Sequence, residues 1–190
     1  MRIDTQIDGD TLRAVMRRVP SPVVVVTAAS HEVRGATIGS FTSVSLNPPL
    51  ISFNIARDSQ MYAVIMAAER FAVHVLTDAH AWLCQHFARP DIESEEQFSS
   101  VTYRLHESGM PILEEAPLVL FCRKYAAYPA GDHTIVVGEV EAIEEHGAGR
   151  PILYYNRSYR GLGKVVTAAL PVATNLESSG RPEAPDPKNA

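Results

Sequence analysis

The sequence predicts a mainly β domain, an antiparallel β-barrel with a few helices. Short runs rich in β-branched and aromatic residues recur along the chain between turn signals, which is typical of strands. Only two or three stretches have helical periodicity, and they do not alternate with the strands as βαβ units would require. An antiparallel barrel is therefore favoured over a doubly wound parallel sheet.

The first half of the chain should contain three helices and four strands. Apolar residues at helical spacing predict a helix over residues 10–19, with Asp10 or Thr11 as N-cap, and Pro20 and Pro22 end it. The strands expected here are a buried one at 23–27, followed by a turn at 31–34, and three more at 35–40, 50–55 and 71–76. Two further helices are expected at 59–69 and at about 80–88, and Ser59 can cap the first of them.

The second half is expected to be rich in strands after a polar, acidic stretch. Residues 89–100 read as an exposed loop that could move. Two long strands follow at 116–128 and 133–146, and a short final strand at 152–155. The end of the chain is polar and rich in proline, so it cannot bury enough surface to offset its ordering entropy. We expect one folded domain over 1–169 and a disordered tail over 170–190.

Composition limits the classes of function. The formal net charge of −5 gives no general attraction to nucleic acid or to anionic membranes, although a local basic pocket remains possible. Two distant cysteines, Cys84 and Cys122, form no CxxC pattern and are expected to be buried small hydrophobes. No signal peptide or membrane-length apolar stretch is visible, so we expect a soluble cytoplasmic protein.

The segment 35–50, GATIGSFTSVSLNPPL, is the most informative part of the sequence. It gathers small hydroxylated residues and two glycines between apolar strands. Small residues let a ligand approach the backbone closely, and hydroxyls and amides can bond a phosphate or ring carbonyls. On composition alone, a serine-rich loop between strands is an equally good interpretation.

Two further segments could bind a nucleotide. Gly131-Asp132-His133 is a turn signal at the mouth of a long strand, where the histidine either contacts a ligand or is simply exposed. The segment 154–162 interleaves tyrosines with Arg157 and Arg160, which suits stacking and phosphate pairing. By itself, a strand edge with snorkelling arginines explains that segment better.

Together these segments resemble the flavin reductase-like family. GATIGSFTSVSLNPPL, GDHTIVVGEV and PILYYNRSYRGL occur in the family's order and spacing, and the similarity runs over residues 11–162. These proteins are reductase components of two-component flavin-dependent monooxygenases. The resemblance implies an FMN-binding split barrel, a homodimer, reduction of FMN or FAD by NADH or NADPH, and a monooxygenase partner that receives reduced flavin by diffusion or in a transient complex.

The resemblance also implies site residues by position. The isoalloxazine and ribityl groups should run beside 37–40, with the ribityl phosphate at the start of the helix after residue 59. Gly39 departs from the family because many relatives have a polar side chain there. The residues implied at the flavin are Thr37, Ile38, Gly39, Ser40, Ser45, Leu46, Asn54, Ser59, Gln60, Phe87 and Ala88. Those implied at the nicotinamide are His133, Arg157 and Tyr159.

No residue is expected to act as an essential acid, base or nucleophile, because hydride transfer is chemistry that the two nucleotides carry. The seven histidines show no HExxH pattern, so no metal site is expected. One rival is a non-catalytic flavin-binding or electron-carrier module, which would not need His133 or the segment 154–160. Another is a pyridoxine-phosphate oxidase-like enzyme, which would need a basic cluster that is not evident in the sequence.

Overall fold

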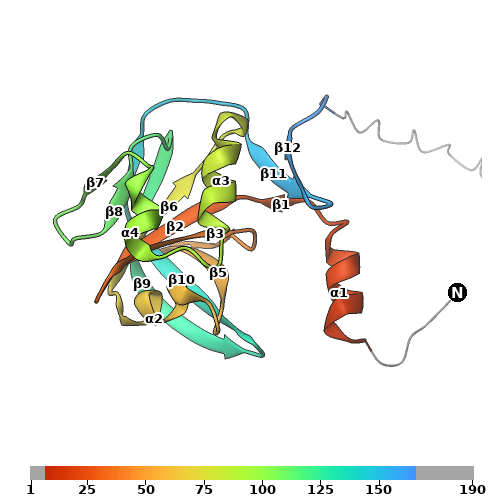
Figure 1. Cartoon of the computed structure of the whole chain (residues 1–190), viewed down its shortest axis with the longest axis horizontal. Helices are drawn as coiled ribbons and strands as arrows, with labels where there is room; N and C mark the ends of the chain where they lie inside the picture. The colour runs from red at the N-terminus through yellow and green to blue at the C-terminus, as the bar shows by residue number, and fades with distance from the viewer. Residues whose placement is uncertain (1–6, 166–190) are drawn as a thin grey trace, which may run out of the picture.

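The computed structural model describes residues 7–165 and is organised around one seven-stranded sheet (Figure 1). The strands run in the order β3-β2-β6-β9-β10-β5-β4, and every neighbouring pair is antiparallel. Their bounds are β2 Val24–Ala29, β3 Val33–Ile38, β4 Thr42–Leu46, β5 Pro49–Ala56, β6 Arg70–Val75, β9 Leu118–Ala130 and β10 His133–Glu145. The predicted antiparallel β architecture is confirmed.

Two smaller sheets and the helices surround this one. The small sheets contain β1 Ser21–Pro22, β11 Ile152–Tyr155 and β12 Ser158–Gly161, and β7 Tyr103–Leu105 with β8 Pro111–Leu113. The helices are α1 Gly9–Met16, α2 Gln60–Ala67, the 3-10 turn η1 Asp78–His80, α3 Ala81–Phe87 and α4 Ser94–Ser99. Figure 1 shows α3 and α4 against the body of the domain, whereas α1 stands apart from it.

Strand β2 lies between two hydrophobic cores. Val24 and Val26 pack into the cluster that includes α2 and β5, while Val25 packs into the cluster with α3 and β8. Successive side chains of a strand point to opposite faces of a sheet. A continuous run of valines therefore forms a strand with no solvent-facing side, which is why this strand could be predicted.

The two edges of the main sheet approach each other just beyond the end of β3. Asn54 on β5 donates its backbone N–H to Ser40 Oγ at 2.9 Å. Ser40 lies two residues after β3, and β5 is the neighbour of β4 at the other edge of the sheet, so this bond joins the two sides of the strand order and partly closes the barrel. The closure brings the segment 35–40 beside β5 and the start of α2.

Helix α1 differs from its prediction at both ends. The N-cap is Asp8, whose carboxylate accepts a bond from the Thr11 N–H at 2.7 Å, and not Asp10 or Thr11. The helix ends at Met16, three residues before the predicted end. No α1 residue is buried, so packing against the core of this chain does not determine where the helix begins or ends.

The predicted exposed loop at 89–100 is wrong in its second half. Residues 94–99 form α4, in which Gln97 and Phe98 are buried, and Ile92 just before it is also buried. Ser94 Oγ donates to the Val33 carbonyl at 2.6 Å. The acidic side chains of α4 face solvent, whereas Gln97 and Phe98 pack inward. The segment was predicted to be a loop because acidic residues dominate its composition.

Five strands were missing from the prediction, namely β1, β4, β7, β8 and β12. The serine-rich connection contains β4, and β12 follows the strand that was predicted to be the last. The long pair β9 and β10 was predicted, but its register shifts twice, between Val137 and Gly138 and between Val140 and Ala142. The predicted tail, 170–190, lies outside the described residues, so the domain boundary at 169 stays a prediction.

Candidate functional site

A cleft of about 1240 Å³ opens where the barrel closes. Its walls come from the β3 segment and its extension to Ser40, from β5, from the start of α2, and from the end of α3 with the loop after it. The start of β10 and one face of α1 complete it. Segments that are far apart in the sequence therefore meet at one surface.

Most of the predicted site residues line this cleft. The flavin-side residues among its walls are Thr37, Ile38, Gly39, Ser40, Asn54, Ser59, Gln60, Phe87 and Ala88. His133, from the predicted nicotinamide side, lies in the same cleft. The fold thus brings together residues that the sequence separates by almost a hundred positions.

Four predicted residues are not among the cleft walls. Ser45 and Leu46 lie on β4, and the Leu46 side chain is 92% exposed. Arg157 and Tyr159 belong to the β11–β12 hairpin, where Arg157 has a positive φ of 63° in the turn. Within one chain these four are not brought to the cleft, and their roles stay predictions.

The hydroxyls of the β3 segment are held by backbone bonds. Thr37 Oγ1 donates to the Cys84 carbonyl of α3 at 2.7 Å, and Ser40 Oγ accepts the Asn54 N–H. A hydroxyl that donates its only hydrogen can still accept, so Thr37 can receive a bond from a ligand but cannot give one. These bonds fix the wall of the cleft against α3 and β5.

A glycine is required at position 35 by the packing beneath the cleft. A Cβ on Gly35 would lie 2.6 Å from the Phe87 ring, well inside van der Waals contact. Phe87 is itself buried, so it forms the floor under the β3 segment and presents little ring surface to a ligand. Phe87 lines the cleft in the environment of a core residue, and its role at the flavin stays a prediction.

Gln97 of α4 completes the hydrogen bonding of the same glycine. Its side-chain oxygen accepts the Gly35 N–H at 2.9 Å, and its amide nitrogen donates to the Gly35 carbonyl at 3.0 Å. A side-chain amide that makes both bonds takes the place of a neighbouring strand, so the N–H and the carbonyl of Gly35 on the edge strand β3 are both hydrogen-bonded. This pair of bonds was not predicted, because it depends on α4, a segment that was expected to be a loop.

The start of α2 offers hydrogen-bond donors to the cleft. The first N–H groups of a helix have no partner within it, and its dipole favours an anion there. Ser59 occupies the N-cap position, but its hydroxyl donates to the Ala56 carbonyl at 2.7 Å and makes no capping bond. The predicted capping interaction is therefore wrong. Ser59 and Gln60 both line the cleft, and their role at the ribityl phosphate stays a prediction.

Arg34 is a cleft residue that the sequence did not single out. Its side chain is only 5% exposed, and Nη1 donates to Gln60 Oε1 at 2.9 Å and to the Ile92 carbonyl at 2.6 Å. Nε lies 3.2 Å from Glu32 Oε1, an ion contact without the alignment of a hydrogen bond. Other cleft residues absent from the prediction include Gly9, Leu12, Arg13, Met16, Arg89, Asp91, Gln97, Asp132 and Ile135.

His133 pairs with Ala56 at the end of β5, close to the start of α2, and its neighbour Asp132 orients it. His133 Nδ1 lies 2.7 Å from Asp132 Oδ1, and because a carboxylate only accepts, Nδ1 carries the hydrogen. This bond lowers the pKa of Asp132 below its usual value. The carboxylate is thus kept ionised and leaves Nε2 of a neutral His133 as an acceptor.

The described residues contain no group of three or more histidine, cysteine, aspartate or glutamate side chains placed to hold a metal ion. Within the same residues, no helix combines the length and the apolar composition needed to cross a membrane. Cys84 and Cys122 are both free and buried, as predicted.

Comparison with known proteins gives a consistent match. The family model described as "Flavin reductase like domain" matches residues 16–163. A flavin reductase from Pseudomonas putida is 36% identical over 165 residues, which cover 86% of this chain and 95% of that protein. The reductase component of an FADH(2)-dependent resorcinol hydroxylase from a Rhizobium species is 31% identical, over 80% of this chain and 86% of that protein.

A solved structure agrees with the sequence matches. The NADH:FAD oxidoreductase of Streptomyces globisporus, in complex with NAD and FAD fragments, superposes with a TM-score of 0.75 at 35% identity. The match covers 84% of this chain and 98% of that one. The antiparallel sheet described above is therefore the split barrel of these enzymes.

Proposed function

Because the chain belongs to the flavin reductase-like family, we propose that the cleft between β3, β5 and α2 is its active site. The protein is an NAD(P)H-dependent flavin reductase that uses NADH or NADPH to reduce FMN or FAD and supplies reduced flavin to a partner monooxygenase. One observation supports the site above all others: nine of the eleven residues implied at the flavin and the histidine implied at the nicotinamide share one cleft.

The cleft has suitable size and chemistry for two nucleotides. Its volume of about 1240 Å³ exceeds the roughly 300–1000 Å³ of pockets that hold one drug-sized ligand. Donors gather where α2 begins, and Arg34 is buried beside them. Hydroxyls and backbone groups of the β3 segment line the middle.

We assign the flavin to the β3 and α2 side of the cleft. Thr37, Gly39 and Ser40 present a wall of small side chains on which a flat ring system can lie. The start of α2, with Ser59 and Gln60, is the place for the ribityl phosphate, since free N–H groups and the helix dipole both favour an anion there.

We assign the nicotinamide to the part of the cleft that His133 lines, where β10 begins. Hydride transfer between a reduced nicotinamide and a flavin is chemistry that the two nucleotides supply when bound. The chain's contribution is to hold them in contact and to exclude water. His133, oriented by Asp132, offers Nε2 as an acceptor that can position a carboxamide, and it is not required to move a proton.

Steady-state oxidation of NADH or NADPH, followed by absorbance at 340 nm with FMN or FAD as acceptor, tests the function. We expect turnover with at least one donor–acceptor pair, and comparing the four pairs identifies the preferred substrates. Flavin binding without oxidation of either donor would instead indicate an electron-carrier module.

Replacing His133 with Ala tests the nicotinamide assignment. We expect a higher KM for the nicotinamide and little change in the single-turnover rate of hydride transfer at saturating donor, because the residue positions and does not react. Loss of the chemical step at saturating donor, with folding intact, would contradict this role.

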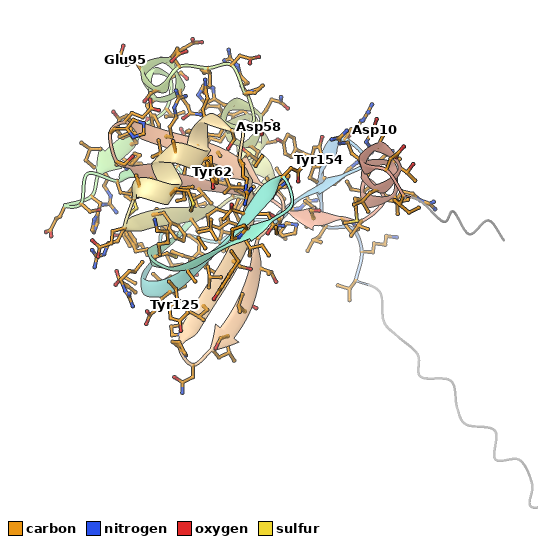
Figure 2. All side chains as sticks on the ribbon, turned by 90° about the horizontal axis from the view of Figure 1, so that it is seen from below. Asp10, Asp58, Tyr62, Glu95, Tyr125 and Tyr154 are labelled. Carbon is orange, nitrogen blue, oxygen red and sulfur yellow. The ribbon has the colours of Figure 1, made fainter. Side chains whose placement is uncertain are left out.

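We also propose that the enzyme is a cytoplasmic homodimer. Helix α1 has no buried residue, and Leu12, Val15 and Met16 on it are about half exposed. Tyr154, another exposed apolar side chain, lies on the side of the molecule where α1, marked by Asp10, stands apart (Figure 2). A helix of eight residues has only marginal stability without tertiary packing. Contact with a second copy of the chain would bury the exposed apolar side chains of α1 and so stabilise it.

A dimer would also explain why the β11–β12 hairpin, with Arg157 and Tyr159, lies outside the cleft of its own chain. From a neighbouring copy it could reach a nucleotide. Sedimentation equilibrium should give twice the chain mass, and Val15→Asp should shift the protein toward a monomer. A monomeric wild type at concentrations that support turnover would refute the dimer.

The free cysteines suit a reducing compartment, and cell fractionation checks the location.

A further inference from the structure

We propose that Arg34 is a positioning residue for the flavin phosphate: it orients the Gln60 amide so that the amide donates to the phosphate. This inference rests on the proposed function and adds to it a residue that acts through another one. Arg34 does not belong to any of the three motifs that indicate the family.

The first step concerns the orientation of Gln60. A guanidinium has only donors, so only the oxygen of the Gln60 amide can face it. Arg34 Nη1 donates to Gln60 Oε1 at 2.9 Å, and this bond fixes which way the amide is turned. The Gln60 nitrogen has no hydrogen-bond partner among residues 7–165, and Gln60 lines the cleft. Its two N–H groups are thus available on the cleft side.

The second step concerns how Arg34 is itself held. It is buried on β3, and Nη1 also donates to the Ile92 carbonyl at 2.6 Å, which ties it to the chain segment before α4. Glu32 Oε1 and Glu93 Oε2 lie 3.2 and 3.7 Å from its nitrogens. These carboxylates partly balance its charge, so the main effect of Arg34 on a bound anion is geometric.

The third step combines these groups at one end of the cleft. Residue 60 is the first of α2, so its side-chain N–H groups lie beside the free backbone N–H groups of that helix turn. A Gln60 amide in the opposite orientation would direct an oxygen at the phosphate and repel it. Arg34 therefore decides whether the side chain at position 60 helps or opposes an anion.

Riboflavin is the probe that separates this role from a general structural one, because it has the isoalloxazine and ribityl chain of FMN without the phosphate. Dissociation constants for FMN and riboflavin can be measured by quenching of flavin fluorescence, with no turnover required. For Arg34→Met we expect FMN binding to weaken about tenfold, as for a lost hydrogen bond to a charged group, with riboflavin binding unchanged. Arg34→Lys should recover part of the FMN binding, because an ammonium also has only donors and turns the same Gln60 oxygen toward itself.

Gln60 provides a variant that keeps the fold even if Arg34→Met does not. Gln60→Glu retains an acceptor for Arg34 and places a negative charge at a helix N-terminus, so the fold should be as stable as wild type or more stable. It replaces the donors with a carboxylate, so we expect FMN binding to fall at least about tenfold while riboflavin binding persists. Arg70→Met is the matched control: it removes one positive charge from a residue that pairs with Glu141 and does not line the cleft.

Equal losses for FMN and riboflavin in folded Arg34→Met would show that Arg34 only supports the fold, and unchanged FMN binding in Gln60→Glu would overturn the proposal. A wild-type protein that binds neither flavin would instead refute the proposed function.

Discussion

His74 makes the stability of this protein depend on pH. It is fully buried on β6, where Nδ1 lies 3.1 Å from the Val25 carbonyl and Nε2 accepts the Leu113 N–H at 3.1 Å. One ring nitrogen must donate and the other accept, so the imidazole has to be neutral to join β2 and β8. Burial lowers the pKa of His74 from 6.5 to about 4.

The size of the effect follows from the two pKa values. The unfolded chain takes up a proton near pH 6.5 and the folded protein does so only near pH 4, so acid favours unfolding between these values. The stability that the neutral His74 provides is complete above pH 6.5 and falls by about 1.4 kcal/mol per pH unit below it. Between pH 7 and pH 5 the loss is about 2 kcal/mol, and by pH 4 about 3 kcal/mol.

Urea unfolding at pH 7, 6 and 5, for the wild type and for His74→Asn, measures this contribution. The variant should be less stable at pH 7, because the Leu113 N–H loses its acceptor. Its free energy of unfolding should nevertheless fall less steeply with acid, by about 2 kcal/mol over this range. Parallel pH dependences for the two proteins would refute the reasoning, because all other titrating groups are common to both.

Three further predictions concern packing around the cleft and the thiols. Gly35→Ala should lower the free energy of unfolding by about 1–3 kcal/mol because its Cβ meets the Phe87 ring, and adding Phe87→Leu should recover part of the loss in urea unfolding. Gln97→Ala should cost about 2 kcal/mol, since both polar groups of Gly35 lose their partner, and should speed proteolysis of residues 89–100, an effect absent from a Ser99→Ala control. Cys84 and Cys122, whose thiol pKa values burial raises to about 11 and about 12, should not react with a thiol reagent at pH 8 until the protein unfolds; rapid labelling of the native protein would contradict their burial.

Strands buried on both faces were the easiest elements to predict. The valine run of β2 and the apolar run of β6 have few alternatives, because exposing either would cost too much apolar surface. Strands that are short, or whose residues are small or exposed, were missed; β8, with three buried residues, was missed because it is short. All of β4 is exposed or half-buried, and its serines and threonine suggest a loop although Val44 and Leu46 alternate with them. β12 is similar, with only four residues, two of them exposed.

The candidate site divides in the same way. Residues within the three motifs were found because hydroxyls, glycines and a histidine stand out in the sequence, and their resemblance to a known family added the roles. Arg34 and Gln97 were not found, because a lone arginine on a strand and a glutamine in an acidic stretch look like surface residues. Only their partners, Gln60, Ile92 and Gly35, reveal what they do.

By itself the sequence determined the class of fold, most strands, and the family with its reductase activity, since these depend on local composition and on motifs that are contiguous in the chain. The tertiary structure alone decided which motif residues share a cleft, how Arg34 and Gln97 hold its walls, and that the β11–β12 hairpin lies outside it. Those outcomes depend on contacts across dozens of residues, such as the 62 positions between Gly35 and Gln97, and such long-range pairings leave no periodic pattern in a single sequence.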